Sequence, residues 1–226
     1  KLRELGVVHI EKRQGAEMDA NLQAFMQKRT AYQSLLKSMK LAAASFEGTA
    51  SDTPSNLTIE QVVQSYEFQQ EHIQSLNMQL PVLDKEIDVM EVWGEFDWSV
   101  IEQLKANGWQ MQFYCCPEKL FEEAWTDEYN ATIINRKGGQ CYFVTVNQMP
   151  VELEAEVVRL PKRRLSELVR EQIELKAEIK KANDELDLFC IDNTPVVERA
   201  LETLDGDINL MEVEQLGGER MADGAI

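Results

Sequence analysis

Apolar side chains recur at alternating steps of four and three residues along three long stretches of the chain. These stretches cover residues 18–46, 59–90 and 165–189. Such a repeat places the apolar side chains along one face of an α-helix. The pattern therefore predicts three long helices, each with a heptad seam that packs against another helix. One polar residue stands in each seam: Arg29, Gln69 and Gln172.

The second and third stretches have matched lengths. At about 1.5 Å of rise per residue, helices over residues 59–90 and 162–190 would each be roughly 45 Å long. Equal lengths favour an antiparallel pairing across the segment that separates the two helices. Pro81 lies inside the first of them, where it removes one helical hydrogen bond and is expected to kink or split the helix.

The returning arm contains a second interruption, the sequence Asp-Asn-Thr-Pro that ends at Pro195. Thr194 is a suitable N-cap and Pro195 a suitable first helical residue, so the arm is expected to break at 192–194 before a last helix. This last helix should lie against residues 16–46. Residues 47–58 have the composition of a loop and should stand opposite the break.

Between the two arms, residues 92–161 have a mixed α/β pattern. Asp97 is placed to cap a short helix, and Phe96 and Ile101 are spaced for a hydrophobic staple at its start. Asn107-Gly108 is expected to end this helix.

The rest of this segment is typical of strands. Strands are predicted at residues 109–115, 131–146 and 154–161, the second of these being a hairpin. Gly138-Gly139 supplies the hairpin turn, and Pro117 is expected to open a short helix that runs to Trp125. The order α-β-α-β-β-β predicts a small, mainly antiparallel sheet with helices on one face, and the chain as a whole is assigned to the α+β class.

The first residues predict a different element. Gly6 follows a Leu-x-x-Leu pattern and is expected to end a helix, after which Val7–Glu11 has the pattern of a short strand. A helix of five residues is an incomplete unit. We therefore expect a strand and most of a helix to precede Lys1.

Charge limits the function classes. The 226 residues carry a formal net charge of −17, whereas a nucleic-acid-binding surface needs basic residues that neutralise phosphates. The same charge disfavours docking on anionic lipid. No stretch approaches the roughly 20 apolar residues of a membrane-spanning helix.

Few residues suggest catalysis or metal binding. His9 and His72 are the only histidines and lie in no metal-binding spacing, so ordinary histidines are favoured over ligands. Cys115-Cys116 could supply a thiol nucleophile, but the two lack a neighbouring base, and a core cysteine beside an edge cysteine is preferred. The four cysteines form no CxxC pair, which favours a reduced, cytosolic chain over a disulfide framework.

Two glycine motifs also have ordinary explanations. Gly138-Gly139-Gln140 matches the catalytic tripeptide of translation release factors, but those factors need a basic surface and a hairpin turn explains both glycines. Gly217-Gly218 lacks the context of a nucleotide-binding loop. The carboxylates fall on helix faces beside lysines, as on any solvated helix. We expect no catalytic, cofactor-binding or metal site.

The order of the motifs resembles a known family. "LRELGVVHIE" leads into long heptads, "VWGEFD" precedes the α/β segment, and "LPKRRLSELVREQIELKAEIKKANDELDLF" begins the returning arm. This arrangement is similar to the cytoplasmic N-terminal region of subunit I of rotary V-type and A-type ATPases, whose eukaryotic homologue is the V-ATPase a subunit. Each motif is short, but their order and spacing cover essentially the whole chain.

The resemblance implies a non-catalytic stator component of a proton- or sodium-translocating ATPase. Its fold would be a dumbbell, with a two-helix coiled-coil rod between a proximal and a distal α/β lobe. The expected partners are the E and G subunits of the peripheral stalk, the C subunit of the central stalk, and the membrane ring through a membrane half that this sequence does not contain. The location would be the cytoplasmic face of the membrane, within a multi-pass membrane protein.

The resemblance also assigns the segments. They are a partial proximal lobe at 1–15, the outgoing arm at 16–91, the distal lobe at 92–161, the returning arm at 162–216, and the start of the segment that closes the proximal lobe at 217–226.

Two tryptophans of the distal lobe are candidates for stalk binding. Val100, Ile101 and Leu104 form the expected core face of the first lobe helix, and Trp98 lies toward its edge. Trp125 ends the core stripe of the second. Tryptophan is enriched among interface hot spots, although packing at the rim of the core is the alternative for both residues.

Two other classes remain open. One is a generic coiled-coil scaffold with an α/β interaction head, such as a hinge-bearing structural-maintenance-type protein, although those have longer arms and a basic DNA-facing surface. The other is an enzyme or ligand-sensing α/β domain with helical extensions. A response of the melting temperature to nucleotides or metabolites would favour this last class.

Overall fold

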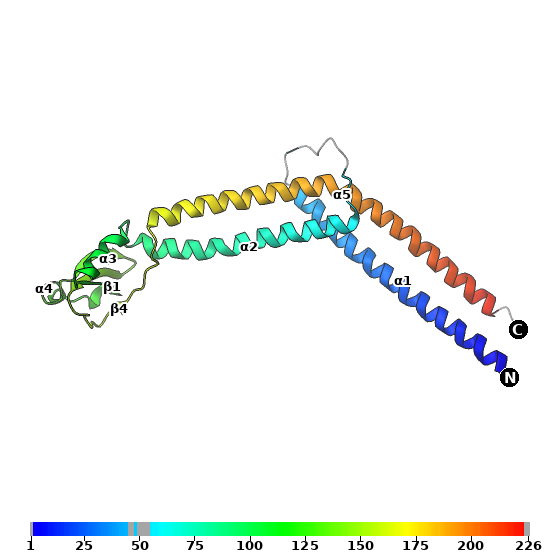
Figure 1. Cartoon of the computed structure of the whole chain (residues 1–226), viewed down its shortest axis with the longest axis horizontal. Helices are drawn as coiled ribbons and strands as arrows, with labels where there is room; N and C mark the ends of the chain where they lie inside the picture. Colours follow the sequence, from blue (N-terminus) through cyan, green and yellow to red (C-terminus); the bar gives the residue numbers. More distant parts are fainter. Residues whose placement is uncertain (1, 45–47, 49–54, 224–226) are drawn as a thin grey trace. The chain divides into compact units, whose positions relative to one another are not determined.

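The computed structural model describes the backbone of residues 2–44, 48 and 55–223, and the side chains of residues 20–44, 48 and 55–215. Long helices accompany one small antiparallel sheet, so the α+β class is confirmed (Figure 1).

The chain forms two compact units. Unit 1 holds Lys1–Ile73 and Lys181–Ile226, and unit 2 holds Gln74–Lys180. The division crosses two long helices, α2 (Ile59–Glu91) and α5 (Leu165–Asp223). Each of these helices therefore contributes one part to each unit.

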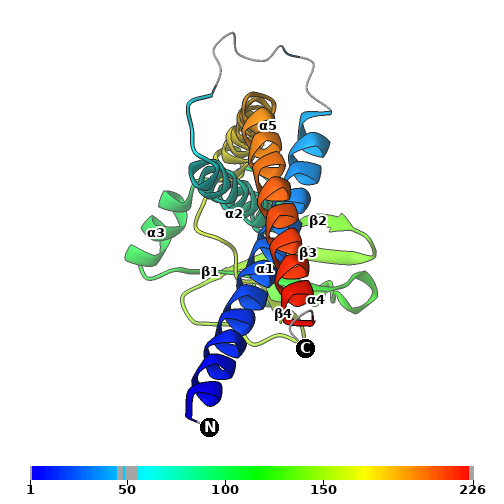
Figure 2. The same ribbon diagram turned by 90° about the vertical axis from the view of Figure 1, so that its right-hand side faces the viewer.

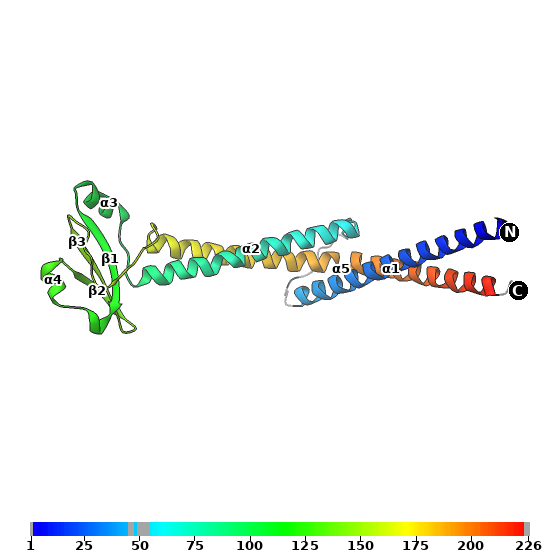
Figure 3. The ribbon, with the colours of Figure 1, turned by 90° about the horizontal axis from the view of Figure 1, so that it is seen from below.

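Unit 1 is built from α1 (Leu2–Ala43) and from the parts of α2 and α5 that fall within it. Arg29 of α1 forms an ion pair with Asp205 of α5, and Lys40 forms one with Glu198, each at 2.6 Å. Because the residue numbers run in opposite directions along the two helices, α1 and the end of α5 are antiparallel (Figures 1 and 3). The expectation that the last helical segment lies against the first long helix is confirmed.

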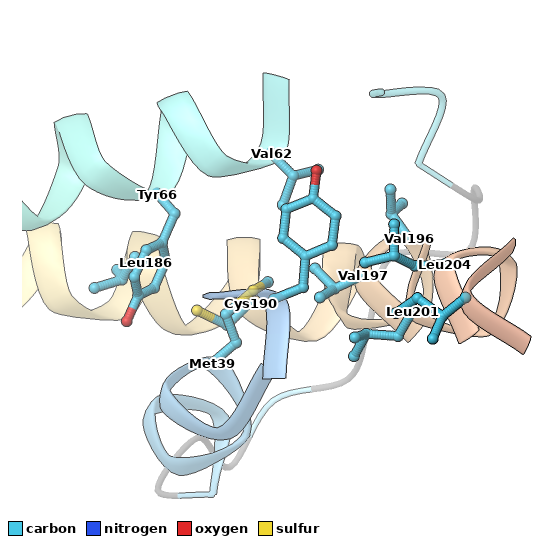
Figure 4. Packing of buried hydrophobic residues seen from close by; sticks show 11 residues of the cluster. Met39, Val62, Tyr66, Leu186, Cys190, Val196, Val197, Leu201 and Leu204 are labelled. Carbon is cyan, nitrogen blue, oxygen red and sulfur yellow. The ribbon is translucent and has the colours of Figure 1, made fainter. Parts of the chain in front are cut away.

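The core of unit 1 joins three helix segments. Met39 of α1, Val62 of α2 and Leu186 of α5 are all buried at predicted seam positions (Figure 4). Further residues of the same three helices complete the cluster: Tyr32, Tyr66, Cys190, Val196, Val197, Leu201, Leu204 and Ile208. Hydrophobic burial at these positions is what holds the three segments together.

The predicted start of the chain is wrong. Helix α1 runs without interruption through Gly6 and through the expected strand Val7–Glu11, so neither a helix end nor a strand is found within the described residues 2–15. A glycine inside a helix costs only about 1 kcal/mol relative to alanine, which helical residues on both sides can offset. At the far end, α5 continues as a helix through Gly217-Gly218 to Asp223.

The predicted break at 192–194 is also wrong. Helix α5 passes through Pro195, so Thr194 is not an N-cap but a helical residue whose hydroxyl donates to the carbonyl of Cys190 at 2.7 Å. A proline inside a helix costs about 3 kcal/mol. Val196 and Val197, which follow it, are buried in the core of unit 1, and their burial offsets that cost.

The described end of the expected loop contacts this point, whereas the expectation for the rest of the loop is not tested. Ser55, at the described end of the segment between α1 and α2, donates from its hydroxyl to Oδ1 of Asn193 at 2.6 Å. The amide nitrogen of Asn193 donates in turn to the carbonyl of Phe189 at 2.8 Å. Both polar ends of this buried amide are therefore satisfied. Most of residues 47–58 lies outside the described part of the chain.

In unit 2, the second half of α2 lies beside the first part of α5 (Figures 1 and 3). Gln172 donates from Nε2 to Oδ1 of Asp84 at 2.5 Å, and Arg163 pairs with Glu86 at 3.5 Å. The buried residues of both segments are predicted seam positions: Leu76, Leu83, Ile87, Met90, Leu168 and Leu175. The antiparallel pairing is confirmed within this unit, and Pro81 does not split α2.

Residues 92–161 form the lobe of unit 2. It begins with α3 (Trp98–Ala106), whose N-cap Asp97 accepts a hydrogen bond from the backbone N–H of Ser99 at 2.9 Å. Asn107 caps the other end, followed by Gly108 at φ +82°. Both predicted ends of this helix are confirmed.

The lobe contains a four-stranded antiparallel sheet. Its strands are β1 (Gln110–Pro117), β2 (Thr132–Lys137), β3 (Gln140–Asn147) and β4 (Glu156–Val157), in the spatial order β2-β3-β1-β4. The predicted order α-β-α-β-β-β is observed. The expected single helix from Pro117 to Trp125 is wrong, because a 3₁₀ turn η1 (Glu118–Leu120) is followed by a separate helix α4 (Ala124–Glu128). Gly138 and Gly139 both have positive φ between β2 and β3, as a type I′ hairpin turn requires.

The helices do not share one face of this sheet, contrary to expectation. Phe113 and Val144 point toward α3, whereas their chain neighbours Tyr114 and Phe143 pack with Trp125 of α4. Figures 2 and 3 show α3 and α4 separated across the lobe. Successive side chains of a strand point to opposite faces. The central strands are apolar at consecutive positions, which is typical of a sheet covered on both sides.

The seam of unit 2 can be tested with one substitution. Leu175→Asp places a carboxylate at a position that is 8% exposed and should lower the free energy of unfolding by roughly 3 kcal/mol or more. Ile173→Asp is the matched control, because Ile173 lies on the same helix and is 61% exposed. Thermal melting followed by circular dichroism measures both. Equal melting temperatures would mean that Leu175 does not face another helix.

Two glycine-to-alanine substitutions should have opposite effects. Gly139 has φ +74°, so Gly139→Ala forces a left-handed backbone on a residue with a Cβ and should destabilise by about 1 kcal/mol. Gly206 lies inside α5 with no atom within 4 Å of an added Cβ, so Gly206→Ala should stabilise by about 0.5–1 kcal/mol. Melting temperatures that move in the same direction for both variants would contradict these backbone assignments.

Candidate docking site

Trp125 belongs to the core of the lobe. The side chain is 6% exposed and packs in one cluster with Tyr114 and Phe143. Its ring stands edge-on to Phe121 at 5.5 Å between centroids. Trp125 is thus more deeply buried than a residue at the rim of the core. A ring enclosed in this way has no exposed face that a partner could contact. Trp125 is therefore not retained as a docking anchor.

Trp98 is half-buried and holds two parts of unit 2 together. Its ring lies 5.1 Å from that of Phe96, and its indole N–H donates to the carbonyl of Arg163 at 3.1 Å. The indole is therefore already engaged in packing on the α3 side of the sheet. Trp98 and Trp125 lie on opposite faces, so the structure does not bring the two candidates into one site.

Polar contacts anchor the start of α5 to the lobe. The carboxylate of Glu95 accepts hydrogen bonds from the backbone N–H of Ser166 at 2.9 Å and from its hydroxyl at 2.8 Å. Glu167 accepts from the backbone N–H of Arg164 at 3.2 Å, as the acidic residue of a capping box does. Both carboxylates satisfy N–H groups that have no partner inside the helix and lie at the positive end of its dipole.

Asp97 takes part in the same arrangement. It caps α3 and also receives a hydrogen bond from the guanidinium of Arg164. The hydrogen bonds from Ser99, followed by those from Arg164, hold the pKa of Asp97 below its usual value. The carboxylate therefore stays ionised where the lobe meets the returning arm.

An apolar pocket opens between α3 and the sheet. Its volume is about 220 Å³. It is lined by Trp93, Phe96, Asp97, Val100, Ile101, Met111, Phe113, Ile134 and Val144. Among these residues Val100 is 53% and Ile134 43% exposed. The helical pattern predicted Val100 to be a core residue. No pattern singled out Ile134, which comes near α3 only through the pairing of β2 with β3.

The cysteines are not placed as nucleophiles. Cys116 and Cys141 face each other across β1 and β3 inside the core of the lobe, and burial raises the pKa of both thiols. Cys115 points to the other face of β1 and is half-buried. Cys116 is the predicted core cysteine, whereas Cys115 lies on a strand between β3 and β4 and not at the edge of the sheet. Burial, with Asp187 nearby, raises the pKa of Cys190 in unit 1 to about 12.

No cluster of potential metal ligands is found in the described part of the chain. His72 is exposed on α2, the side chain of His9 lies outside the described residues, and no group of three or more potential metal ligands is found among the rest. The Gly138-Gly139 pair forms a hairpin turn, as expected, and Gly217-Gly218 lies within α5 rather than in a loop. No helix over the described residues is long and apolar enough to cross a membrane.

Comparison with known proteins gives no relative. No family model, curated protein or solved structure matches the chain.

The raised pKa of Cys190 predicts how the unfolding free energy changes at alkaline pH. The folded state holds this thiol protonated up to about pH 12, whereas the unfolded chain releases the proton above its ordinary pKa of 9.0. Its contribution to stability is thus complete below pH 9 and is lost as the pH rises toward 12. Between pH 8 and pH 10 the wild type should lose roughly 1 kcal/mol more unfolding free energy than Cys190→Ala.

Urea unfolding of both proteins at the two pH values measures this difference. Comparing the change with pH, rather than the stability itself, removes the cost of the smaller side chain and the titration of every other group. An identical pH dependence in the two proteins would contradict a buried, protonated Cys190.

Proposed function

We propose that this chain is the cytoplasmic region of subunit I of a rotary proton- or sodium-translocating ATPase, where it links the peripheral stalks to the membrane sector. Its partners would be the E and G subunits of the peripheral stalk and the C subunit of the central stalk, at the cytoplasmic face of the membrane. The role is mechanical and non-catalytic, and the membrane ring is reached through a membrane half outside this sequence.

The observation that carries the proposal is the placement of the lobe in unit 2. Its first residue follows the end of α2, and α5 begins soon after its last strand, so one antiparallel helix pair holds both ends of the lobe. Glu95, Asp97 and Trp98 contact the start of α5. A lobe fixed at both ends passes a load to two helices rather than to a flexible tether.

The helix pair suits a stator. A stator must resist the torque of a rotor, and two helices joined along an apolar seam resist bending, because bending shears packed side chains past one another. We extend this to the finer architecture, a coiled-coil rod with the lobe of residues 92–161 at its distal end.

The alternative is a generic coiled-coil scaffold with an α/β interaction head. One observation favours it: α1 is a continuous helix where subunit I would have a helix end, a glycine and a strand. Both functions rely on the lobe as a docking head, and they differ in the partner that it binds.

Binding to the stalk separates the two. Isothermal titration calorimetry of this chain against the purified E–G heterodimer from the same genome should give a Kd on the order of 10 μM or tighter, and the central-stalk partner should be tested in the same way. An acidic helical protein of similar net charge serves as control for non-specific attraction. If neither stalk partner binds at a concentration of about ten times this Kd, the stator proposal is wrong and the scaffold function is favoured.

A thermal-shift screen with common nucleotides and metabolites covers the enzyme or ligand-sensing class. The stator and scaffold functions both require an unchanged melting temperature. A rise that depends on ligand concentration would favour this third class instead.

A further inference from the structure

The two faces of the lobe sheet are filled to different degrees. On the α4 face, Tyr114 and Phe143 are fully buried and Trp125 nearly so. On the α3 face, the helix itself has no buried residue. Val100, which the helical pattern assigns to the core face, is more than half exposed. Trp98 and Ile101 are half-buried against the cluster of Trp93, Phe113 and Val144, so the apolar face of α3 is covered only in part. The exposed Val100 leaves apolar surface available for another molecule.

The unfilled volume has the size of one large side chain. The pocket between α3 and the sheet holds about 220 Å³, and an apolar cavity of about 150 Å³ already accommodates a benzene-sized group. Its walls include the aromatic rings of Phe96 and Phe113, whose centroids are 5.8 Å apart. Val100 and Ile134 extend the apolar surface beyond the pocket on two different elements.

The segment that supplies much of the pocket wall is acidic. Residues 91–102, which supply much of the pocket wall, contain four carboxylates and no lysine or arginine: Glu91, Glu95, Asp97 and Glu102. The nearest compensating partners come from elsewhere, since Arg164 pairs with Asp97 and Lys137 with Glu91 at 4.0 Å. A partner with basic residues beside its apolar anchor would complement this surface. A chain of net charge −17 would also repel such a partner less than it would repel an acidic one.

We propose that the α3 pocket receives a large apolar side chain, such as leucine, methionine or phenylalanine, from an amphipathic helix with basic flanks in a partner protein. This inference rests on the proposed function, since it places the docking site of the stalk on the α3 face of the lobe. It moves the docking surface from Trp125 to the pocket lined by Val100, Ile101 and Ile134. An anchor buried in a pocket, surrounded by weaker charged contacts, is the usual composition of an interface hot spot.

Three variants test the pocket. Val100→Glu and Ile134→Glu place a carboxylate at the pocket rim, where both native side chains are exposed enough for the lobe to fold. Ile101→Phe fills the pocket without a change of charge. Leu120→Glu is the matched control, because Leu120 is 59% exposed on η1, outside the pocket lining. Circular dichroism melting must first show that each variant is folded.

The readout is the Kd for the purified E–G heterodimer by calorimetry, at about 50 mM and 300 mM NaCl. Each pocket variant should bind at least about 30-fold more weakly than the wild type, the usual loss at a hot spot, and Leu120→Glu should stay within about twofold. For the wild type, higher salt should weaken binding, because charge attraction between exposed groups is screened.

The outcomes separate the two proposals. If the three pocket variants are folded and bind the heterodimer as tightly as the wild type, the pocket is not the docking site. The proposed stator function would be unaffected by that result. Equal losses in the pocket variants and in Leu120→Glu would also overturn it, since the effect would then follow any added charge. Lack of binding by the wild type itself would overturn the stator function and the pocket assignment together.

Discussion

The structure depends on the burial of one apolar stripe along each long helix. Without its seam, each of these helices would be an extended amphipathic segment with little reason to stay ordered, because most helical stability in proteins comes from packing. Each fully buried large aliphatic side chain contributes about 1.5–3 kcal/mol. In unit 1 the seams of α1, α2 and α5 converge on Met39, Val62 and Leu186. In unit 2 the antiparallel pairing fixes both ends of the lobe.

The two faces of the lobe sheet have different roles. The α4 face is closed by Tyr114, Phe143 and Trp125 and provides stability. The α3 face is only partly covered and provides apolar surface beside a row of carboxylates. A tryptophan is therefore a poor guide to docking in this protein, because Trp125 and Trp98 are both used for internal contacts. The exposed aliphatic residues Val100 and Ile134 mark the open face instead.

Short sequence motifs predicted the structure correctly where that structure depends only on neighbouring residues. The Asp97 cap, the Asn107-Gly108 end of α3 and the Gly138-Gly139 turn each depend on the backbone of a few neighbouring residues, and all three are observed. Gly6 and Pro195 are also strong local signals, yet the helices continue through both. For Pro195 the preference of about 3 kcal/mol against an interior proline is smaller than the combined burial of the side chains that follow it.

The sequence by itself determined the apolar seams of the long helices, because the spacing of apolar positions sets the buried face of a helix, but it did not do so for α3, whose Val100 is exposed. It also determined the order of elements in the lobe and the antiparallel hairpin. Only the tertiary structure decided which face of the sheet each lobe helix covers, since consecutive apolar residues in β1 and β3 fit either side. It likewise decided the pocket, because Val100 and Ile134 lie far apart in the sequence and are brought together by strand pairing, which no local pattern records.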